Sequence, residues 1–440
     1  MRPEPTREPG MFALVLHSHL PWLANHGRWP VGEEWLYQSW AATYLPVVDV
    51  LRRLTDEGHT RLLTLGITPV LAAQLDDPHS LTGMHHWLGN WKLRAHEAAG
   101  MAEPSYRALG AREHRAADWA LESFETRWRH GGSPVIRELI DADTIELLGG
   151  PLAHPFQPLL DPRLRAFSLS EGLEDAHQRW HHTPRGIWGP ECGFTPGMEK
   201  GYAAAGVEHF MVDGPALHGD TALGRTVRES DVVCFGRDLQ VSYRVWSPKS
   251  GYPGHSAYRD FHTYCHDTGL KPSRVTGRTV ASEDKAPYDP DLASAALDRH
   301  VEDFVDTVRK RLRNESARIG RDALVVAAFD TELFGHWCTR DRSSSNDCCV
   351  HCPKPGSRSA RSPTHAIADT SADRWTSRTR PGDRGRTGGC GPVTRSPIWS
   401  SSTTRWSPPL STPSTSPATR SGRTPRTYAT GCTTRFCVKH

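Results

Sequence analysis

The sequence predicts an α/β fold built as a parallel β/α barrel. Short apolar stretches typical of strands alternate with longer stretches of helical periodicity along most of the chain. Several of the predicted strands end in polar residues, the pattern expected where an active site gathers at the carboxyl ends of barrel strands. The 440 residues suffice for one elaborated barrel or for two or three domains.

Six short apolar stretches predict strands, because each is brief and bounded by turn or polar residues. In chain order they are Phe12–His17, Leu62–Thr68, Thr144–Gly150, Gly186–Glu191, His209–Asp213 and Ala323–Phe329. Helices are predicted where apolar residues recur at helical spacing or follow a proline that can open a helix. These stretches are Glu33–Leu54, a helix opening at Pro69, about Thr82 to Asp143, Pro196–Ala205 and Leu292–Leu312. Between them, Gly236–Pro290 is irregular, and a loop of that length inside a fold is usually functional.

The charge balance differs between the two parts of the chain. The last 103 residues hold 17 Lys or Arg and five Asp with no Glu, whereas the first 337 hold 36 basic and 45 acidic residues. A mildly acidic catalytic part argues against nucleic acid as a partner.

Three observations predict a soluble cytoplasmic protein. Only Cys192, Cys234 and Cys265 lie before residue 338, which suits a reducing compartment. The first residues lack the apolar run of a secretory signal, and no stretch approaches the roughly 20 apolar residues of a membrane span. No membrane partner is therefore expected.

The motif HSHLPW ends the first predicted strand. His17 and His19 stand at i and i+2, where side chains of a strand face the same side, so they could ligate a metal. No third ligand with a recognisable metal motif accompanies them, and a sugar-binding role is favoured over a metal. His154 follows the Gly-rich turn GGPLAHPF, where a lone histidine is more often structural than catalytic.

Two acidic motifs give the strongest functional signal. Glu191 stands between Pro190 and Cys192 at a predicted strand end, where the alternative is a capping or ion-paired carboxylate. Asp330 follows an apolar strand in FDTELFGHW, and we assign Glu332 of the same motif to supporting the loop. A carboxylate pair of this kind suits glycosidic bond chemistry, in which one group attacks or shields the anomeric carbon and the other protonates the leaving oxygen.

Aromatic and histidine side chains near these motifs suit a sugar substrate, since flat rings pack on sugars and imidazoles bond to hydroxyls. The tryptophans in or near the motifs are Trp22, Trp29, Trp188, Trp246 and Trp337. Any one of them alone is more often part of a core than a sugar platform.

Four of these motifs, in order, resemble glycoside hydrolase family 57. HSHLPW resembles the first block, GGPLAHPF the second, WGPECGF the third with the nucleophile, and AFDTELFGHW the fourth with the general acid/base. The resemblance covers about residues 11–337. Within the family, GITPVLAAQL, FDTELFGHW and the stretch after Arg28 resemble the bacterial 1,4-α-glucan branching enzymes more than the amylases.

The resemblance implies a distorted seven-stranded β/α barrel, a retaining mechanism, no cofactor and no metal. It assigns Glu191 as nucleophile and Asp330 as general acid/base, acting on α-1,4-glucan. Tyr252, in SGYPG, resembles a mobile-loop tyrosine of branching members, although this sequence also fits an ordinary surface turn. The predicted substrate-binding residues are His17, His19, Trp22, His154, Trp188, Trp246, Tyr252, His336 and Trp337.

Residues after Trp337 depart from the family. Arg, Ser, Thr, Pro and Cys dominate there without apolar periodicity, as in a disordered basic tail, and the Cys348–Cys352 cluster has no second half of a zinc module. The genetic code offers a better account. If one base was lost at codon 338, Trp337–Cys352 restores, with suitable third bases, as the helical WWHEGPFFLERLLRAL, and 386–407 restores as a further helical stretch.

The predicted organisation is thus a disordered N-terminus at 1–10, a catalytic barrel at 11–337 and a frameshifted, largely disordered tail at 338–440. The barrel carries a helical insertion at about 82–143 and a lid region at about 236–290. Loss of the family's C-terminal helices would expose apolar barrel surface, and we expect a poorly folded or inactive product. Three functions stay open: glucan branching, hydrolysis or 4-α-glucanotransfer within the same family, and non-catalytic glucan binding. The oligomeric state is left open.

Overall fold

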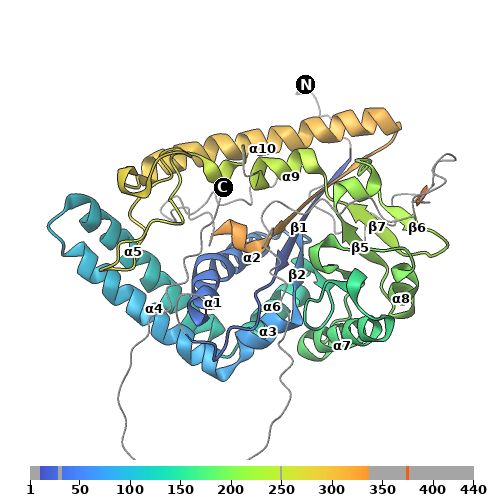
Figure 1. The fold of residues 1–440 in the computed structure, drawn as a ribbon, viewed down its shortest axis with the longest axis horizontal. Coiled ribbons are helices and arrows are strands. Elements are labelled where there is room, and N and C mark those ends of the chain that lie inside the picture. The colour runs from blue at the N-terminus through green and yellow to red at the C-terminus, as the bar shows by residue number, and fades with distance from the viewer. Residues whose placement is uncertain (1–9, 28–31, 248–249, 336–372, 376–440) are drawn as a thin grey trace, which may run out of the picture. The chain divides into compact units, whose positions relative to one another are not determined.

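A computed structural model of the chain describes residues 10–27, 32–247, 250–335 and 373–375 (Figure 1). All of them belong to the first of two units of the chain, Met1–Arg380. The predicted N-terminal segment 1–9 and nearly all of the predicted tail lie outside the described residues.

Seven parallel strands form the centre of the fold, in the order β8-β1-β2-β3-β4-β5-β7. Two short strands extend this sheet beyond β7: β6 pairs with it antiparallel, and β9 pairs with β6 in parallel. The strands are β1 Met11–Ser18, β2 Leu63–Ile67, β3 Ile145–Gly149, β4 Gly186–Ile187, β5 His209–Val212, β6 Arg225–Val227, β7 Val233–Gly236, β8 Leu324–Asp330 and β9 Asp373–Trp375. The predicted α/β class with a parallel sheet is confirmed.

Alternation along the strands separates two cores, because successive side chains of a strand point to opposite faces. One face of β1, β3, β5, β7 and β8 fills the inside of the curved sheet with a cluster that contains Ala13, Val15, Leu148, Trp188, Met211, Val233, Phe235, Leu324, Val326 and Ala328. The other face of β1 and β8, including Leu14, Leu16 and Phe329, packs against helices in the largest core cluster. A parallel sheet covered on both faces explains why its strands are near-continuous apolar runs.

The two end strands of the seven, β7 and β8, meet at a seam centred on Asp238. In the part of the chain that the structure describes, no ladder joins them; instead the Asp238 backbone N–H donates to the Val326 carbonyl at 2.8 Å. The Asp238 carboxylate accepts from the backbone N–H of Val241 at 3.0 Å and from Arg311 Nε at 2.7 Å. The buried Asp238 side chain thus caps the helix Leu239–Trp246 and binds the helix that carries Arg311 to the seam.

Replacing Asp238 with alanine should lower the free energy of unfolding by about 1–2 kcal/mol, because it removes a helix cap and one of the two carboxylates that pair with the partly buried Arg311, the other being Glu315. Chemical denaturation measures this. Asp231→Ala is the control, since Asp231 is an exposed turn residue between β6 and β7 and should change little. Equal effects of the two substitutions would contradict the role given to the seam.

The helices surround the sheet in Figure 1, with α4 and α5 forming a projecting hairpin and α10 running beside α9. Their bounds are α1 Glu33–Ser39, α2 Leu45–Asp56, α3 Pro69–Asp76, α4 Pro78–Ala99, α5 Pro104–Ser123, α6 Gly132–Asp141, α7 Pro162–Trp180, α8 Met198–Ala204, α9 Leu239–Trp246 and α10 Pro290–Ile319. π-helical turns at Trp40–Tyr44 and Phe124–Trp128 follow α1 and α5. None of the described helices is both long and apolar enough to cross a membrane.

Five elements differ from the sequence prediction. The predicted strand Gly186–Glu191 ends at Ile187, and Glu191 lies in a short 3-10 turn instead. The irregular region Gly236–Pro290 contains α9, whose start is capped by Asp238. α7 and the strands β6 and β7 were not predicted. The strands of three and four residues are too short to show periodicity.

Candidate active site

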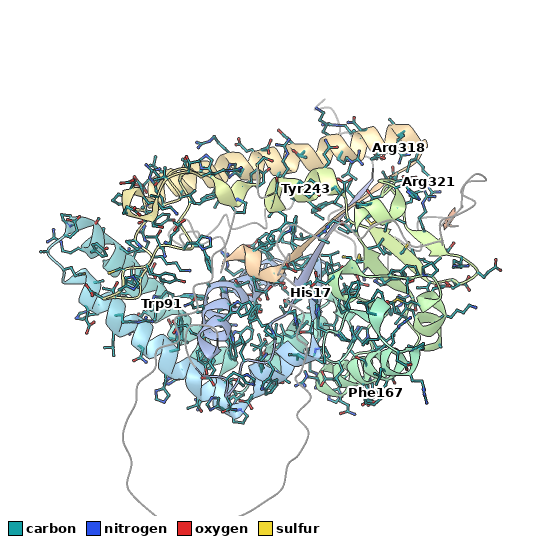
Figure 2. The ribbon with its side chains drawn as sticks, in the orientation of Figure 1. His17, Trp91, Phe167, Tyr243, Arg318 and Arg321 are labelled. Carbon is teal, nitrogen blue, oxygen red and sulfur yellow. The ribbon has the colours of Figure 1, made fainter. Side chains whose placement is uncertain are left out.

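The carboxyl ends of the parallel strands bring the predicted functional residues to one rim. Around the sheet from β8 to β7, the side chains at or just after the strand ends are Asp330, His17, Thr68, His154, Glu191, Asp213 and Arg237. Asp330 and His17 are direct partners in the β8–β1 register. Figure 2 shows His17 near the middle of the molecule, where the strands converge.

Glu191 lies in a strained turn. Its backbone has φ 57° and ψ 23°, and the next residue, Cys192, also has a positive φ of 53°. Such conformations are costly for residues other than glycine and persist where the surroundings fix them. Here the N–H groups of Cys192 and Gly193 donate to the carbonyls of Gly189 and Pro190 at 2.8 and 3.0 Å. This turn leaves Glu191 exposed at the rim, consistent with a functional role.

Both carboxyls have raised pKa values. Burial and the nearby Glu191 charge raise the pKa of Asp330 to about 6, although Arg237 opposes the shift. Partial desolvation also raises the pKa of the more exposed Glu191, and Arg237 opposes that shift too. A pKa of about 6 suits Asp330 to donate a proton near neutral pH, as a general acid must.

Three histidines form a stacked group beside the carboxylates. The Nε2 atoms of His17 and His154 are 2.9 Å apart, and the His19 and His154 rings stack at 3.8 Å. His19 Nδ1 is 3.0 Å from the Thr68 hydroxyl.

All three imidazoles are neutral at neutral pH. Burial lowers the pKa of His17 well below its usual range and that of His19 to about 4; for His154, burial and the His19 charge lower the pKa to about 3. A neutral imidazole can both donate and accept, which suits sugar hydroxyls. Among residues 10–27, 32–247 and 250–335, no group of three or more His, Cys, Asp or Glu side chains is arranged to hold a metal ion.

The two predicted tryptophans nearest the rim have different environments. Trp188 is buried and stacks on His17 with 4.6 Å between ring centroids, so it forms a wall behind that ring. Trp22 is 44% exposed, which leaves its ring free for a sugar. Buried Gln74 holds the Trp22 segment, because its amide accepts from Leu23 N–H at 2.6 Å and donates to the Pro21 carbonyl at 2.9 Å.

Tyr252 and Trp246 lie away from this group in the structure. The Tyr252 hydroxyl donates to Asp303 on α10 at 2.5 Å, and its ring stacks on His300 at 4.4 Å. Trp246 ends α9 and packs against the main core. A sugar-binding role for either residue remains a prediction. His336 and Trp337 lie outside the described residues.

The predicted lid region is attached to the helical insertion. Buried Arg259 donates to Glu113 on α5 at 2.6 Å, and the Trp91 indole donates to the same carboxylate at 3.0 Å (Figure 2 labels Trp91 on α4). The Arg259 guanidinium also lies 4.6 Å from the centre of the Tyr288 ring. In this conformation the segment around Arg259 is a fixed wall, because a buried, ion-paired charge is costly to separate from its partner.

Sequence reasoning missed Arg237 and Tyr44. Arg237 follows β7, and its Nε and Nη2 both donate to Asp213 Oδ1 at 3.1 Å. The tyrosine hydroxyl of Tyr44, at the end of a π-helical turn, donates to Glu332. The polar pair Arg237-Asp238 directly after the apolar VVCFG was the available signal for Arg237, whereas nothing in the sequence linked Tyr44 to a residue 288 positions away.

Glu332 is buried at the turn after Asp330, in keeping with a supporting role. Burial and the Asp330 charge raise its pKa to about 8, while bonds from Tyr44 and backbone groups oppose the shift. A carboxyl whose pKa rises on folding stabilises the fold below its unfolded pKa, and this contribution is lost as pH rises through the folded pKa. Between about pH 4.5 and 8, Glu332 should therefore make the fold less stable with rising pH.

Glu332→Gln should remove this dependence, since the amide keeps a donor and an acceptor but cannot ionise. Melting temperatures of the two proteins, measured from pH 5 to 8, should diverge in favour of the variant as pH rises. The expected divergence is at least about 2 °C, the size of a 1 kcal/mol change in a domain of this class. A constant difference would contradict the raised pKa of Glu332, and Glu171→Gln at an exposed position of α7 serves as the control.

Comparisons with known proteins fit this arrangement. The model of glycosyl hydrolase family 57 matches residues 13–340. The chain is 68% identical over 343 residues to a probable 1,4-alpha-glucan branching enzyme of Mycobacterium tuberculosis, over 75% of this chain and 65% of the relative. It is 31% identical over 368 residues to the 1,4-alpha-glucan branching enzyme of Thermococcus kodakarensis, over 74% of this chain and 53% of the relative. The chain thus spans less than two thirds of these relatives.

Solved structures share the fold. The branching enzyme of the hyperthermophilic archaeon Pyrococcus horikoshii superposes with a TM-score of 0.77 at 26% identity, covering 83% of this chain and 72% of that one. The alpha-amylase of Thermotoga maritima has a TM-score of 0.75 at 24% identity, covering 83% and 76%, and supports the fold alone.

Proposed function

The chain belongs to glycosyl hydrolase family 57, and from this membership we propose that it is a retaining glycosyl transferase acting on α-1,4-glucan. The observation that supports the proposal is the pair of carboxyls on one rim, Glu191 after β4 and Asp330 at the end of β8, close enough for the Glu191 charge to act on Asp330. Double displacement at an acetal needs two such carboxyls, one as nucleophile and one as acid/base.

In the proposed first step, a carboxylate oxygen of Glu191 bonds to the anomeric carbon while the glycosidic C–O bond breaks. Asp330 gives its proton to the departing sugar oxygen and is left ionised. In the second step, Asp330 takes a proton from an acceptor hydroxyl, whose oxygen displaces Glu191. Neutral His17, His19 and His154 would bond to sugar hydroxyls, and exposed Trp22 would pack on a ring.

We propose that the acceptor is the 6-hydroxyl of another α-1,4-glucan chain, which makes the reaction a branching. Both curated relatives described above carry the name 1,4-alpha-glucan branching enzyme. Transfer to a sugar requires that water be kept from the intermediate, and the wall fixed by Arg259 and Glu113 would contribute to this.

We further propose that residues from Cys338 onward are encoded out of frame, as their composition predicts. The family match supports this, since it ends at residue 340, within three residues of Trp337. The gene sequence around codon 338 tests it. A single intact frame, with no helical product one base over, would overturn the proposal.

Product analysis tests the reaction. Amylose is incubated with the 440-residue chain and with a form whose frame is restored at codon 338, and the products are debranched with isoamylase. We expect the frame-restored form to produce new α-1,6 linkages without a matching rise in reducing ends, and the 440-residue chain to produce far fewer. A rise in reducing ends alone would mean hydrolysis, longer linear chains would mean 4-α-glucanotransfer, and unaltered amylose with both forms would contradict glucan transfer.

We propose a cytoplasmic location for the protein. The three cysteines among the described residues, Cys192, Cys234 and Cys265, are all free thiols, as expected in a reducing compartment.

A further inference from the structure

Arg237 and Asp213 form a fixed ion pair on the rim. They follow β7 and β5, which are neighbouring strands, and both Arg237 nitrogens Nε and Nη2 bond to one carboxylate oxygen of Asp213. The Arg237 backbone N–H also donates to the Val212 carbonyl at 3.0 Å. Its side chain is 23% exposed, so the cation is held in a partly desolvated position.

This pair lies in the arc of the rim between the two proposed reacting carboxyls. Glu191 follows β4 and Asp330 ends β8, and β5 and β7 are the strands between them on the side of the seam. The other arc, across β1, β2 and β3, carries the neutral histidines. In the described part of the rim, Arg237 is the cation whose charge opposes the upward pKa shifts of both Glu191 and Asp330.

We propose that Arg237, oriented by Asp213, is a positioning residue that keeps Glu191 ionised beside the protonated Asp330. The inference rests on the proposed function and adds to it the group that sets the charge state of the nucleophile.

The physical reason is that two neighbouring carboxyls tend to share one proton. In part of the molecules that proton would lie on Glu191, and a protonated carboxyl is a poor nucleophile. A fixed cation favours the ionised form of both groups. The other groups near this pair do not replace it: Glu332, with its pKa raised to about 8, is protonated below that pH, and burial keeps the Cys192 thiol protonated with a pKa of about 12. Asp213 carries the opposite charge.

The test measures how fast Glu191 of the full 440-residue chain is labelled by 5-fluoro-α-maltosyl fluoride between pH 4 and 8. In this step the Glu191 carboxylate bonds to the anomeric carbon and fluoride leaves as an anion, so no acid is needed. Mass spectrometry follows the sugar-bearing peptide. The variants are Arg237→Met and Arg237→Lys, and Arg185→Met is the control, because Arg185 precedes β4 at the opposite end of the sheet.

In the unchanged protein the labelling rate should fall as pH drops through the pKa of Glu191. Arg237→Met should move this midpoint up by about one pH unit, which is about tenfold slower labelling below it. Arg237→Lys keeps the positive charge, so its midpoint should lie close to that of the unchanged protein. Arg185→Met should have the same midpoint as the unchanged protein. Melting curves establish that each variant folds, and Arg237→Gln replaces the Met variant if that one does not.

Superimposed profiles for the unchanged protein and the Met or Gln variant would overturn the inference, as would a folded Lys variant that behaves like Met. These outcomes leave the proposed function intact. If the 440-residue chain is not labelled, the same variants are measured in the form whose frame is restored at codon 338. Failure to label either form at any pH would instead count against the proposed function.

Discussion

Glu191→Gln is expected to abolish covalent labelling and to reduce glucan turnover by about 10⁴-fold or more, equivalent to about 5.5 kcal/mol of lost transition-state stabilisation. The amide has nearly the shape of the carboxylate but cannot attack the anomeric carbon. Because Glu191 is exposed in its turn, the substitution should leave the melting temperature nearly unchanged. The loss would then report chemistry and not unfolding.

Asp330→Asn separates the two roles. With a glycosyl fluoride, whose leaving group needs no proton, this variant should still be labelled at Glu191, whereas its turnover of amylose should fall by about 10²–10⁴-fold. Labelling that persists in Glu191→Gln, or that moves to another carboxylate, would contradict the assignment of the nucleophile. The control is Glu171→Gln, because Glu171 is exposed, whereas Glu199 is buried.

Restoring the reading frame at codon 338 is expected to raise branching activity at least about 100-fold over the 440-residue chain, a change of about 2.7 kcal/mol in the barrier. The restored residues would form helices that cover apolar barrel surface and contribute to the acceptor side. Activity is measured as new α-1,6 linkages per unit time at equal protein concentration. A chain stopped at codon 338 is the matched control.

The control distinguishes two causes of low activity. If the family's helices are what is missing, the stopped chain and the 440-residue chain should be equally poor. If the existing tail itself interferes, the stopped chain should be the more active of the two. Full branching activity in the unmodified 440-residue chain would contradict the frameshift hypothesis.

The fold class and the locations of the site residues could be predicted because they depend on local patterns. The apolar runs of β1 and β8, each followed by polar residues, indicated both the parallel sheet and the rim that carries His17 and Asp330. The two-residue strand β4 and the four-residue strand β7 gave too little pattern. As a result, the turn geometry of Glu191 was not foreseen, and neither was the position of Arg237.

Contacts between distant segments could not be predicted at all. The Tyr44 bond to Glu332 and the Arg259 bond to Glu113 join residues 288 and 146 positions apart, and neither pair forms a motif. The seam is similar, since nothing in the sequence links Asp238 to Val326, and their contact follows only from the order of the strands.

The junction at Asp238 has a consequence for heat inactivation. Neighbouring strands elsewhere in the described sheet share a ladder, whereas the Asp238 amide alone reaches across from the end of β7 to β8, so local opening should cost least at this point. The strands on either side carry Arg237 and Asp330. Warming should therefore separate this cation from the acid, and abolish the proposed activity, at temperatures where most of the backbone is still protected from hydrogen exchange.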